Sequence, residues 1–231
     1  MVDSGDQETA RSPVPENESI ESVFPSVVER VYQELGQEKQ PGAFGGACGF
    51  AASVAEHLVG YQNVNQPRSG VETKVVQTLW LHEAADGKSL ADVAEQVKSI
   101  HIRLEYPEVC SYAFQHAVLL VHQGDTFFLL DPTFCQFMSP EEGVVQQGSH
   151  KSSGVSIEDP LVQELYQKGY ITFTAGNARR YLELTSIPSH HATIPASIDV
   201  SALFNSTLRE IPEFDTQELD RYFAKDTDKP S

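Results

Sequence analysis

The stretch "HAVLLVHQGDTFFLLDPTF", residues 116–134, decides the fold of this chain. Two short apolar runs, rich in Val, Leu and Phe, are separated by "HQGD", and this pattern predicts an antiparallel β-hairpin. The first run begins at His116 and the second ends at Asp131. The hairpin therefore carries two polar side chains at the open end of two otherwise apolar strands.

A loop centred on Gln123 and Gly124 would place His116 directly opposite Asp131 on the neighbouring strand. Directly opposed side chains share one face of a sheet, with Cβ atoms roughly 4.5 to 5.5 Å apart. The carboxylate can then accept the imidazole N–H and fix the tautomer of the ring. A register slip of one residue would separate the pair onto opposite faces.

A nucleophile for such a base is expected at Cys48, in "KQPGAFGGACGFAASVAEHLVG", residues 39–60. The glycines predict a loop, and the small residues from Ala47 predict a helix that ends near Gly60. A helix N-terminus carries partial positive charge, which lowers the pKa of a thiol placed there. The Cys48 backbone N–H and a side-chain amide, from Gln40 or Gln37, would be the donors of an oxyanion hole.

The order Cys48, His116, Asp131 resembles the papain-like cysteine superfamily. Its blocks here are "GACGFAASVAEHL" as nucleophile helix, "HAVLLV" as histidine strand and "FFLLDPTFCQF" as aspartate strand. The "DPTF" ending is most similar to transglutaminase-like domains, and the histidine and aspartate blocks also resemble those of YopT-type effector proteases. Arylamine N-acetyltransferases share this core, but their "RGGRCFE" block is missing here.

The resemblance implies an α+β fold with a papain-like or transglutaminase-like core, in which the nucleophile helix packs on an antiparallel sheet. It implies cysteine-dependent acyl transfer or hydrolysis at an amide by a Cys48–His116–Asp131 triad, as in a protease, glutamine deamidase or transglutaminase. The alternative is a catalytically inactive domain of the same fold that serves as a protein-interaction module. No cofactor is expected.

The formal net charge of −17 disfavours nucleic acid or an anionic membrane as the main partner and favours a protein or peptide substrate of basic character. Three cysteines do not suggest a disulfide framework, and Cys110 and Cys135 are expected to be packing residues. Without a signal-peptide pattern, we expect a cytoplasmic protein or one exported without a cleavable signal. The oligomeric state is open.

A metal site built from Cys110, His116, His122 and Cys135 is disfavoured, because these residues lack the short spacings of zinc sites. His122 is expected in the turn and is the reserve base if the register is wrong.

The remaining sequence predicts one domain over residues 23–205, between a disordered acidic segment, residues 1–22, and a partly ordered tail, residues 206–231. Helices are expected over 20–35, 89–104 and 159–169, and a strand over 170–176. Residues 73–81 are predicted as strand or helix, residues 179–187 as a strand, and residues 63–72 and 144–155 as loops.

Overall fold

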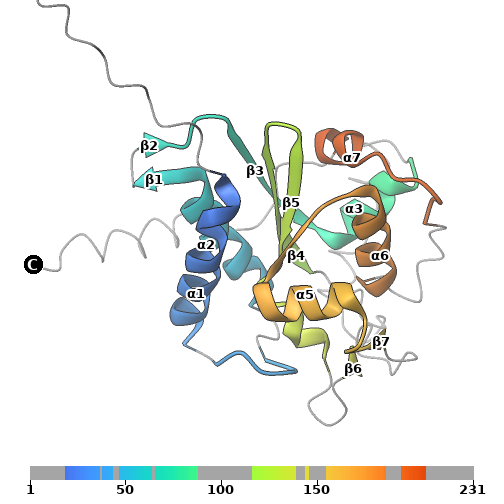
Figure 1. Cartoon of the computed structure of the whole chain (residues 1–231), viewed down its shortest axis with the longest axis horizontal. Helices are drawn as coiled ribbons and strands as arrows, with labels where there is room; N and C mark the ends of the chain where they lie inside the picture. The colour runs from blue at the N-terminus through green and yellow to red at the C-terminus, as the bar shows by residue number, and fades with distance from the viewer. Residues whose placement is uncertain are drawn as a thin grey trace, which may run out of the picture.

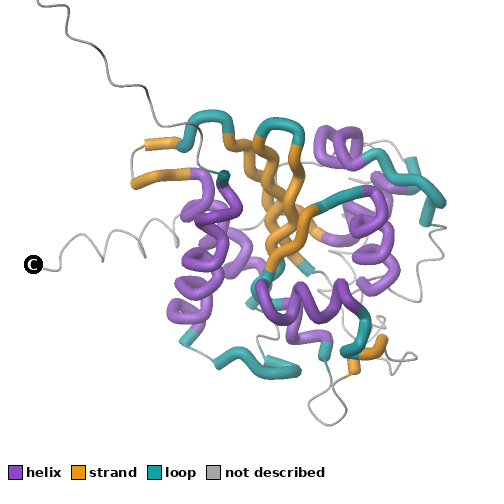
Figure 2. Tube along the Cα trace, viewed as in Figure 1, coloured by secondary structure: helices purple, strands orange, loops and turns teal. Residues whose placement is uncertain are grey.

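A computed structural model of the chain describes residues 19–36, 38–43, 47–63, 66–87, 116–138, 144–145, 155–185 and 194–206. It has an α+β architecture built around an antiparallel sheet of four strands in the order β3-β4-β5-β8 (Figures 1 and 2). The strands are β3 (Val71–Gln77), β4 (Ala117–Gln123), β5 (Thr126–Leu130) and β8 (Tyr170–Thr172). The α+β class and the antiparallel sheet are therefore as predicted.

Helices cover both faces of this sheet, so every residue of β4 from Ala117 to Val121 is buried (Figure 1). One face packs against α1 (Phe24–Leu35) and α2 (Cys48–Gly60). The other face packs against α3 (Thr78–Ala85), α5 (Pro160–Lys168), α6 (Ala175–Thr185) and α7 (Val200–Ser206). A strand buried on both faces reads as a continuous apolar run, which is why "AVLLV" shows no alternation.

Short elements complete the described part of the chain. The 3-10 helices are η1 (Ile20–Val23) and η3 (Phe134–Phe137). Two further pairs of short antiparallel strands are β1 (Tyr61–Asn63) with β2 (Gln66–Pro67), and β6 (Val144–Val145) with β7 (Val155–Ser156). None of the described helices has both the length and the apolar character that crossing a bilayer requires.

Several helix predictions are confirmed. The first helix ends at Gly36, whose φ of 60° is in the left-handed region that favours glycine. The helix α5 begins after Asp159, whose carboxylate accepts the Leu161 and Val162 amides, with Pro160 in the first turn. The folded part starts earlier than residue 23, because Ile20 is buried and its amide donates to Gln123 Oε1 at 2.8 Å.

Other predictions are wrong or lie elsewhere. Residues 179–187 were expected to form a strand, but residues up to Thr185 belong to helix α6, because Ala178, Tyr181 and Leu182 form a buried helical stripe. The loop predictions over 63–72 and 144–155 miss the short strand pairs. The stretch 73–81 is strand and then helix. The predicted helix 89–104 and nearly all of the predicted tail lie outside the described residues.

The register of the hairpin differs from the prediction by two residues. The turn is formed by Gly124 and Asp125, so Gln123 pairs with Thr126 and Val121 pairs with Phe128 rather than with Thr126. His116 and Asp131 are therefore not directly opposed. A shift of two residues preserves the face on which each side chain lies, because strand side chains alternate with a period of two. The two polar residues become diagonal neighbours on one face, still within reach of each other.

Candidate active site

His116 and Asp131 meet at the open end of the β4–β5 hairpin. His116 immediately precedes β4 and Asp131 immediately follows β5. His116 Nε2 lies 2.7 Å from Asp131 Oδ2, and the two side chains are 1% and 0% exposed. This distance is that of a hydrogen bond to a charged acceptor. The pairing that the sequence predicted is therefore present, although the register that predicted it was wrong.

The carboxylate of Asp131 is held by several donors. Besides the imidazole, Tyr181 Oη donates to Oδ2 at 3.0 Å and Thr133 Oγ1 donates to Oδ1 at 3.3 Å. The backbone amide of Asp131 donates to the Gly169 carbonyl at 2.8 Å. A fully buried carboxylate stays charged only when such partners replace the lost water. Asp131 is thus fixed both in position and in orientation.

Cys48 is the first residue of α2 and reaches the same end of the sheet. A side-chain hydrogen bond joins its thiol to His116, and the Ala117 backbone amide also donates to the sulfur. Because Nε2 of His116 faces Asp131, Nδ1 is the ring nitrogen left for the thiol. No side chain caps this helix end, where the first-turn amides supply partial positive charge.

The electrostatics of the pair favour a thiolate and an imidazolium. Burial alone raises the pKa of Cys48, but the hydrogen bond and positive charge of His116 and the Ala117 amide outweigh it and lower the pKa below its ordinary value. Burial alone lowers the pKa of His116, but the Asp131 carboxylate and the hydrogen bonds to Asp131 and Cys48 raise it to about 9. The environment of Cys48 is thus that of a reactive thiol.

Cys135 provides the contrast within the same region. It is also buried and free, but burial raises the pKa of its thiol to about 12, and the nearby Asp131 charge acts in the same direction. Its backbone carbonyl accepts the Gly42 amide at 2.7 Å. Cys135 is therefore a packing residue, as expected. Cys110 lies outside the described residues.

Of the predicted oxyanion donors, the Cys48 backbone amide lies at the start of α2. Gln40 lies in the loop before α2 with an exposed side chain, and Gln37 is outside the described residues. The structure instead brings Gln136 to the site. Its Nε2 lies 3.2 Å from His116 Nδ1 and donates to the Thr133 carbonyl at 3.1 Å. Neither Gln136 nor Tyr181 was expected from the sequence, since both contacts depend on the fold of the chain after Asp131.

His122, the reserve base, lies at the other end of β4 from His116. Its ring stacks on Phe127 with centroids 4.2 Å apart and planes 7° from parallel. Its Nδ1 is 3.9 Å from a carboxylate oxygen of Glu72, whose side chain is 67% exposed. His122 therefore cannot act on Cys48. Among the described residues, no group of three His, Cys, Asp or Glu side chains could hold a metal ion.

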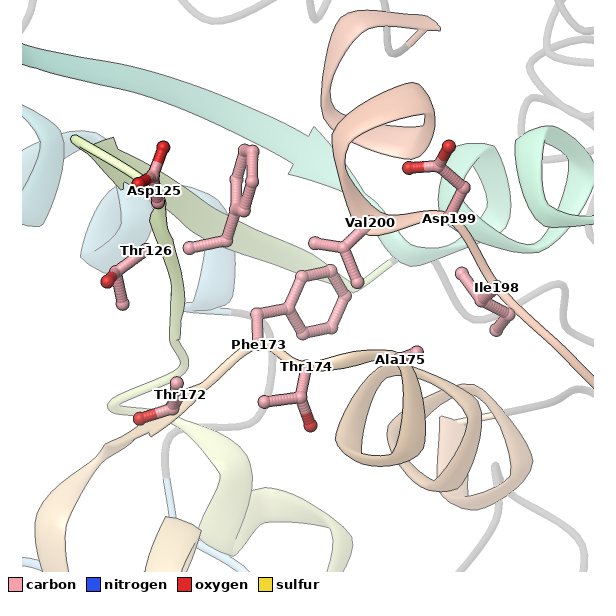
Figure 3. A pocket seen from close by; sticks show the side chains of 10 residues that line it. Asp125, Thr126, Thr172, Phe173, Thr174, Ala175, Ile198, Asp199 and Val200 are labelled. Carbon is pink, nitrogen blue, oxygen red and sulfur yellow. The ribbon is translucent and has the colours of Figure 1, made fainter.

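A cavity of about 450 Å³ also lies at the turn end of the hairpin (Figure 3). Its walls include Asp125 and Phe127 from the hairpin, Phe173 after β8, and Asp199 and Val200 before and in α7. None of the three triad residues lines it. The cavity and the Cys48–His116–Asp131 cluster are thus separate features of the molecule.

No protein-family model matches the chain, and neither the curated proteins nor the solved structures provide a match.

Proposed function

We propose that this chain is an enzyme of the papain-like cysteine superfamily that carries out acyl transfer or hydrolysis at an amide, with Cys48 as nucleophile. The observation that carries this proposal is the buried His116, which contacts the Asp131 carboxylate through one ring nitrogen and Cys48 through its other side. Nucleophile, base and orienting acid are the three parts of an acyl-transfer triad.

The first half of the proposed reaction forms an acyl-enzyme. The Cys48 thiolate attacks the amide carbon, and the carbonyl oxygen becomes an oxyanion beside the N-terminus of α2. His116 then gives its Nδ1 proton to the departing nitrogen, the C–N bond breaks and a thioester remains on Cys48. Asp131 keeps its negative charge throughout and stabilises the imidazolium.

The second half returns the enzyme to its starting state. Neutral His116 accepts a proton from an incoming water or amine, which attacks the thioester carbon. The carbon–sulfur bond breaks, the thiolate leaves, and the imidazolium is restored. Water gives a protease or a glutamine deamidase, and an amine gives a transferase. The three outcomes share every residue of the triad. The acceptor distinguishes transfer from hydrolysis, and the amide that is attacked, in the peptide backbone or in a glutamine side chain, distinguishes the protease from the deamidase.

The oxyanion hole is proposed to contain the Cys48 backbone amide. Gln40 remains the sequence candidate for the second donor, and the Gln136 amide is the one that the described structure places next to His116. The acidic surface, with a formal net charge of −17, supports a protein or peptide substrate of basic character through electrostatic steering.

The competing proposal is an interaction module with the same fold and no chemistry. A module of that kind has no need for a lowered thiol pKa, and burial would by itself raise the pKa of Cys48. The contact between the Cys48 thiol and His116, which lowers the pKa of that thiol, is the specific feature that favours the enzyme.

The proposal is tested by incubating a proteome-derived peptide library and a biotinylated primary amine with the wild type, with Cys48→Ala and with Cys135→Ala. New peptide termini identify hydrolysis, a gain of about one dalton at glutamine identifies deamidation, and captured biotin identifies amine transfer. We expect one of these products from the wild type and from Cys135→Ala, and none from Cys48→Ala. Identical product lists from all three proteins would favour the interaction module.

A further inference from the structure

A buried tyrosine hydroxyl shares the oxygen that Asp131 offers to His116. Tyr181, in the middle of α6, is 0% exposed, and its Oη donates to Asp131 Oδ2 at 3.0 Å. The same Oδ2 lies 2.7 Å from His116 Nε2. Two donors from different elements thus converge on one carboxylate oxygen that no solvent reaches.

We propose that Tyr181 is a positioning residue of this site, which divides the negative charge of Asp131 between its own hydroxyl and His116 and so limits how firmly the imidazole holds its second proton. The effect on the imidazole stands on the geometry alone, whereas its consequence for catalysis rests on the proposed function.

The direction of the effect follows from the two charge states of the imidazole. When His116 is neutral, the Asp131 charge has no counterion among its three donors, and the Tyr181 hydroxyl stabilises it strongly. When His116 is an imidazolium, the ion pair already neutralises much of that charge, and the hydroxyl contributes less. Tyr181 therefore favours the neutral imidazole relative to what Asp131 alone would impose.

The other groups around the imidazole act in both directions. The Cys48 thiol, from α2, forms a hydrogen bond with the imidazole and favours the imidazolium, against the effect of Tyr181. From η3, the neutral Gln136 amide approaches Nδ1, and the Phe137 ring contacts the imidazole edge-on at 4.7 Å between centroids. The Thr133 hydroxyl, which donates to Asp131 Oδ1, acts in the same direction as Tyr181, but the Tyr181 hydroxyl donates to Oδ2, the oxygen that His116 contacts. Such a limit matters because a general acid must release its proton near the working pH.

Tyr32 provides a matched control, because its hydroxyl bonds to the residue that follows Asp131. Tyr32 Oη donates at 3.0 Å to the backbone carbonyl of Pro132, the residue after Asp131. Burial raises the pKa of the Tyr32 phenol, so this hydroxyl is also a neutral donor. Tyr32→Phe and Tyr181→Phe each remove one part-buried or buried hydroxyl bond near Asp131, but only Tyr181→Phe removes a bond to the carboxylate.

The test is an NMR titration of protein labelled with ¹⁵N-histidine, in which the His116 signals are assigned by their loss in His116→Gln. Tyr181→Phe is expected to raise the midpoint of the His116 titration by about 0.5 to 1 pH unit, a ~3- to 10-fold tighter hold on the proton. Tyr32→Phe is expected to leave the midpoint in place. An unchanged midpoint in Tyr181→Phe, or an equal shift in both variants, would overturn the proposal.

A second variant keeps the test decisive if Tyr181→Phe does not fold. Incorporation of 3-fluorotyrosine at position 181 retains the ring and makes the hydroxyl a stronger donor. The His116 midpoint should then move in the opposite direction, to lower pH. A purely packing role for Tyr181 predicts no change, and a shift to higher pH contradicts the proposal.

The two proposals fail in different ways. With an active wild type, the alkaline limb of the turnover profile should move upward with the NMR midpoint in Tyr181→Phe. If the NMR midpoint moves as expected while the wild type and Cys48→Ala give identical products, the role of Tyr181 stands and the enzymatic function fails. If turnover depends on Cys48 but the midpoint does not move, the function stands and Tyr181 is a packing residue.

Discussion

The two ends of the β4–β5 hairpin each carry a histidine, and the two histidines lie in different environments. His122, near the turn, stacks on Phe127 and keeps 27% of its side chain exposed. His116, at the open end, is 1% exposed and contacts Asp131, Cys48 and Gln136. The same residue type is thus half-buried at the turn end of the hairpin and fully buried beside a carboxylate at the open end. Burial with charged partners, rather than the presence of a histidine, distinguishes the candidate site.

Substituting each histidine in turn tests whether turnover depends on His116 and not on His122. His116→Gln should reduce turnover by about 10⁴-fold or more, because the thiol loses its base and its counterion together. His122→Gln should change turnover less than about twofold, since its contacts lie at the turn end. Steady-state rates on a substrate found by the library experiment provide the measurement. A large loss in His122→Gln alone would exchange the roles of the two ends.

Asp131→Asn separates the charge of the third residue from its hydrogen bonds. The amide oxygen can still accept from His116 and Tyr181, and the amide nitrogen can donate to the Thr133 hydroxyl, which is able to accept. The hydrogen bonds survive and the negative charge is lost, so the pKa of His116 should fall. We expect turnover to drop by about 10²- to 10⁴-fold, measured together with the melting temperature.

The melting temperature of Asp131→Asn decides whether lost turnover reflects a catalytic or a structural role of Asp131. A melting temperature close to that of the wild type, with lost turnover, supports the catalytic role of Asp131. Parallel losses of melting temperature and turnover would instead mean that Asp131 is only structural.

Two glycines with positive φ, one near each end of the β4–β5 hairpin, allow the two ends to be compared by the stability that an alanine substitution costs. Gly124 in the turn has a φ of 60° and no heavy atom within 4 Å of an added Cβ, so Gly124→Ala should cost about 1 kcal/mol from backbone strain alone. Gly169 has a φ of 75°, and an added Cβ would lie 3.0 Å from both methyl carbons of Val28. Gly169→Ala should cost more than Gly124→Ala in denaturant unfolding, by roughly a further 1 to 3 kcal/mol.

Gly169→Ala also affects the site, because the Gly169 carbonyl accepts the Asp131 amide. Turnover under conditions where both variants are folded should therefore fall in Gly169→Ala and remain near wild type in Gly124→Ala. Equal stability losses and equal turnover would show that the backbone at the two ends is equally tolerant.

The sequence predicted the residues of the site better than the geometry that joins them. The apolar runs and "HQGD" located the hairpin, and the glycine loop before a small-residue helix located Cys48, because both signals are local. The register was wrong by two residues, since the turn is formed by Gly124 and Asp125, one position further along the chain than the predicted turn centred on Gln123 and Gly124. The prediction of the pair survived only because an even shift preserves the face.

The supporting residues could not be predicted, because their partners are remote in the sequence. Tyr181 is 50 residues from Asp131, and its stretch was expected to be a strand. The helical spacing of Ala178, Tyr181 and Leu182 would have indicated α6, but no pattern indicates which polar group a buried hydroxyl will meet. No sequence signal distinguishes Gln136 from other glutamines, because only the fold of the chain after Asp131 brings its amide to the imidazole.

The most direct test of the central claim is the rate of Cys48 alkylation by iodoacetamide as a function of pH, followed by peptide mapping in the wild type and in His116→Gln. Because His116 lowers the pKa of Cys48, the wild-type rate should rise and level off well below pH 8.5, about the midpoint of an ordinary thiol, and Cys48 should react faster than Cys135. In His116→Gln the hydrogen bond and charge of His116 are lost, while burial and the Asp131 charge still raise the pKa of Cys48 and only the Ala117 amide still lowers it, so the midpoint should move to higher pH. A wild-type midpoint at or above about 8.5 that does not change in His116→Gln would contradict an activated Cys48–His116 pair.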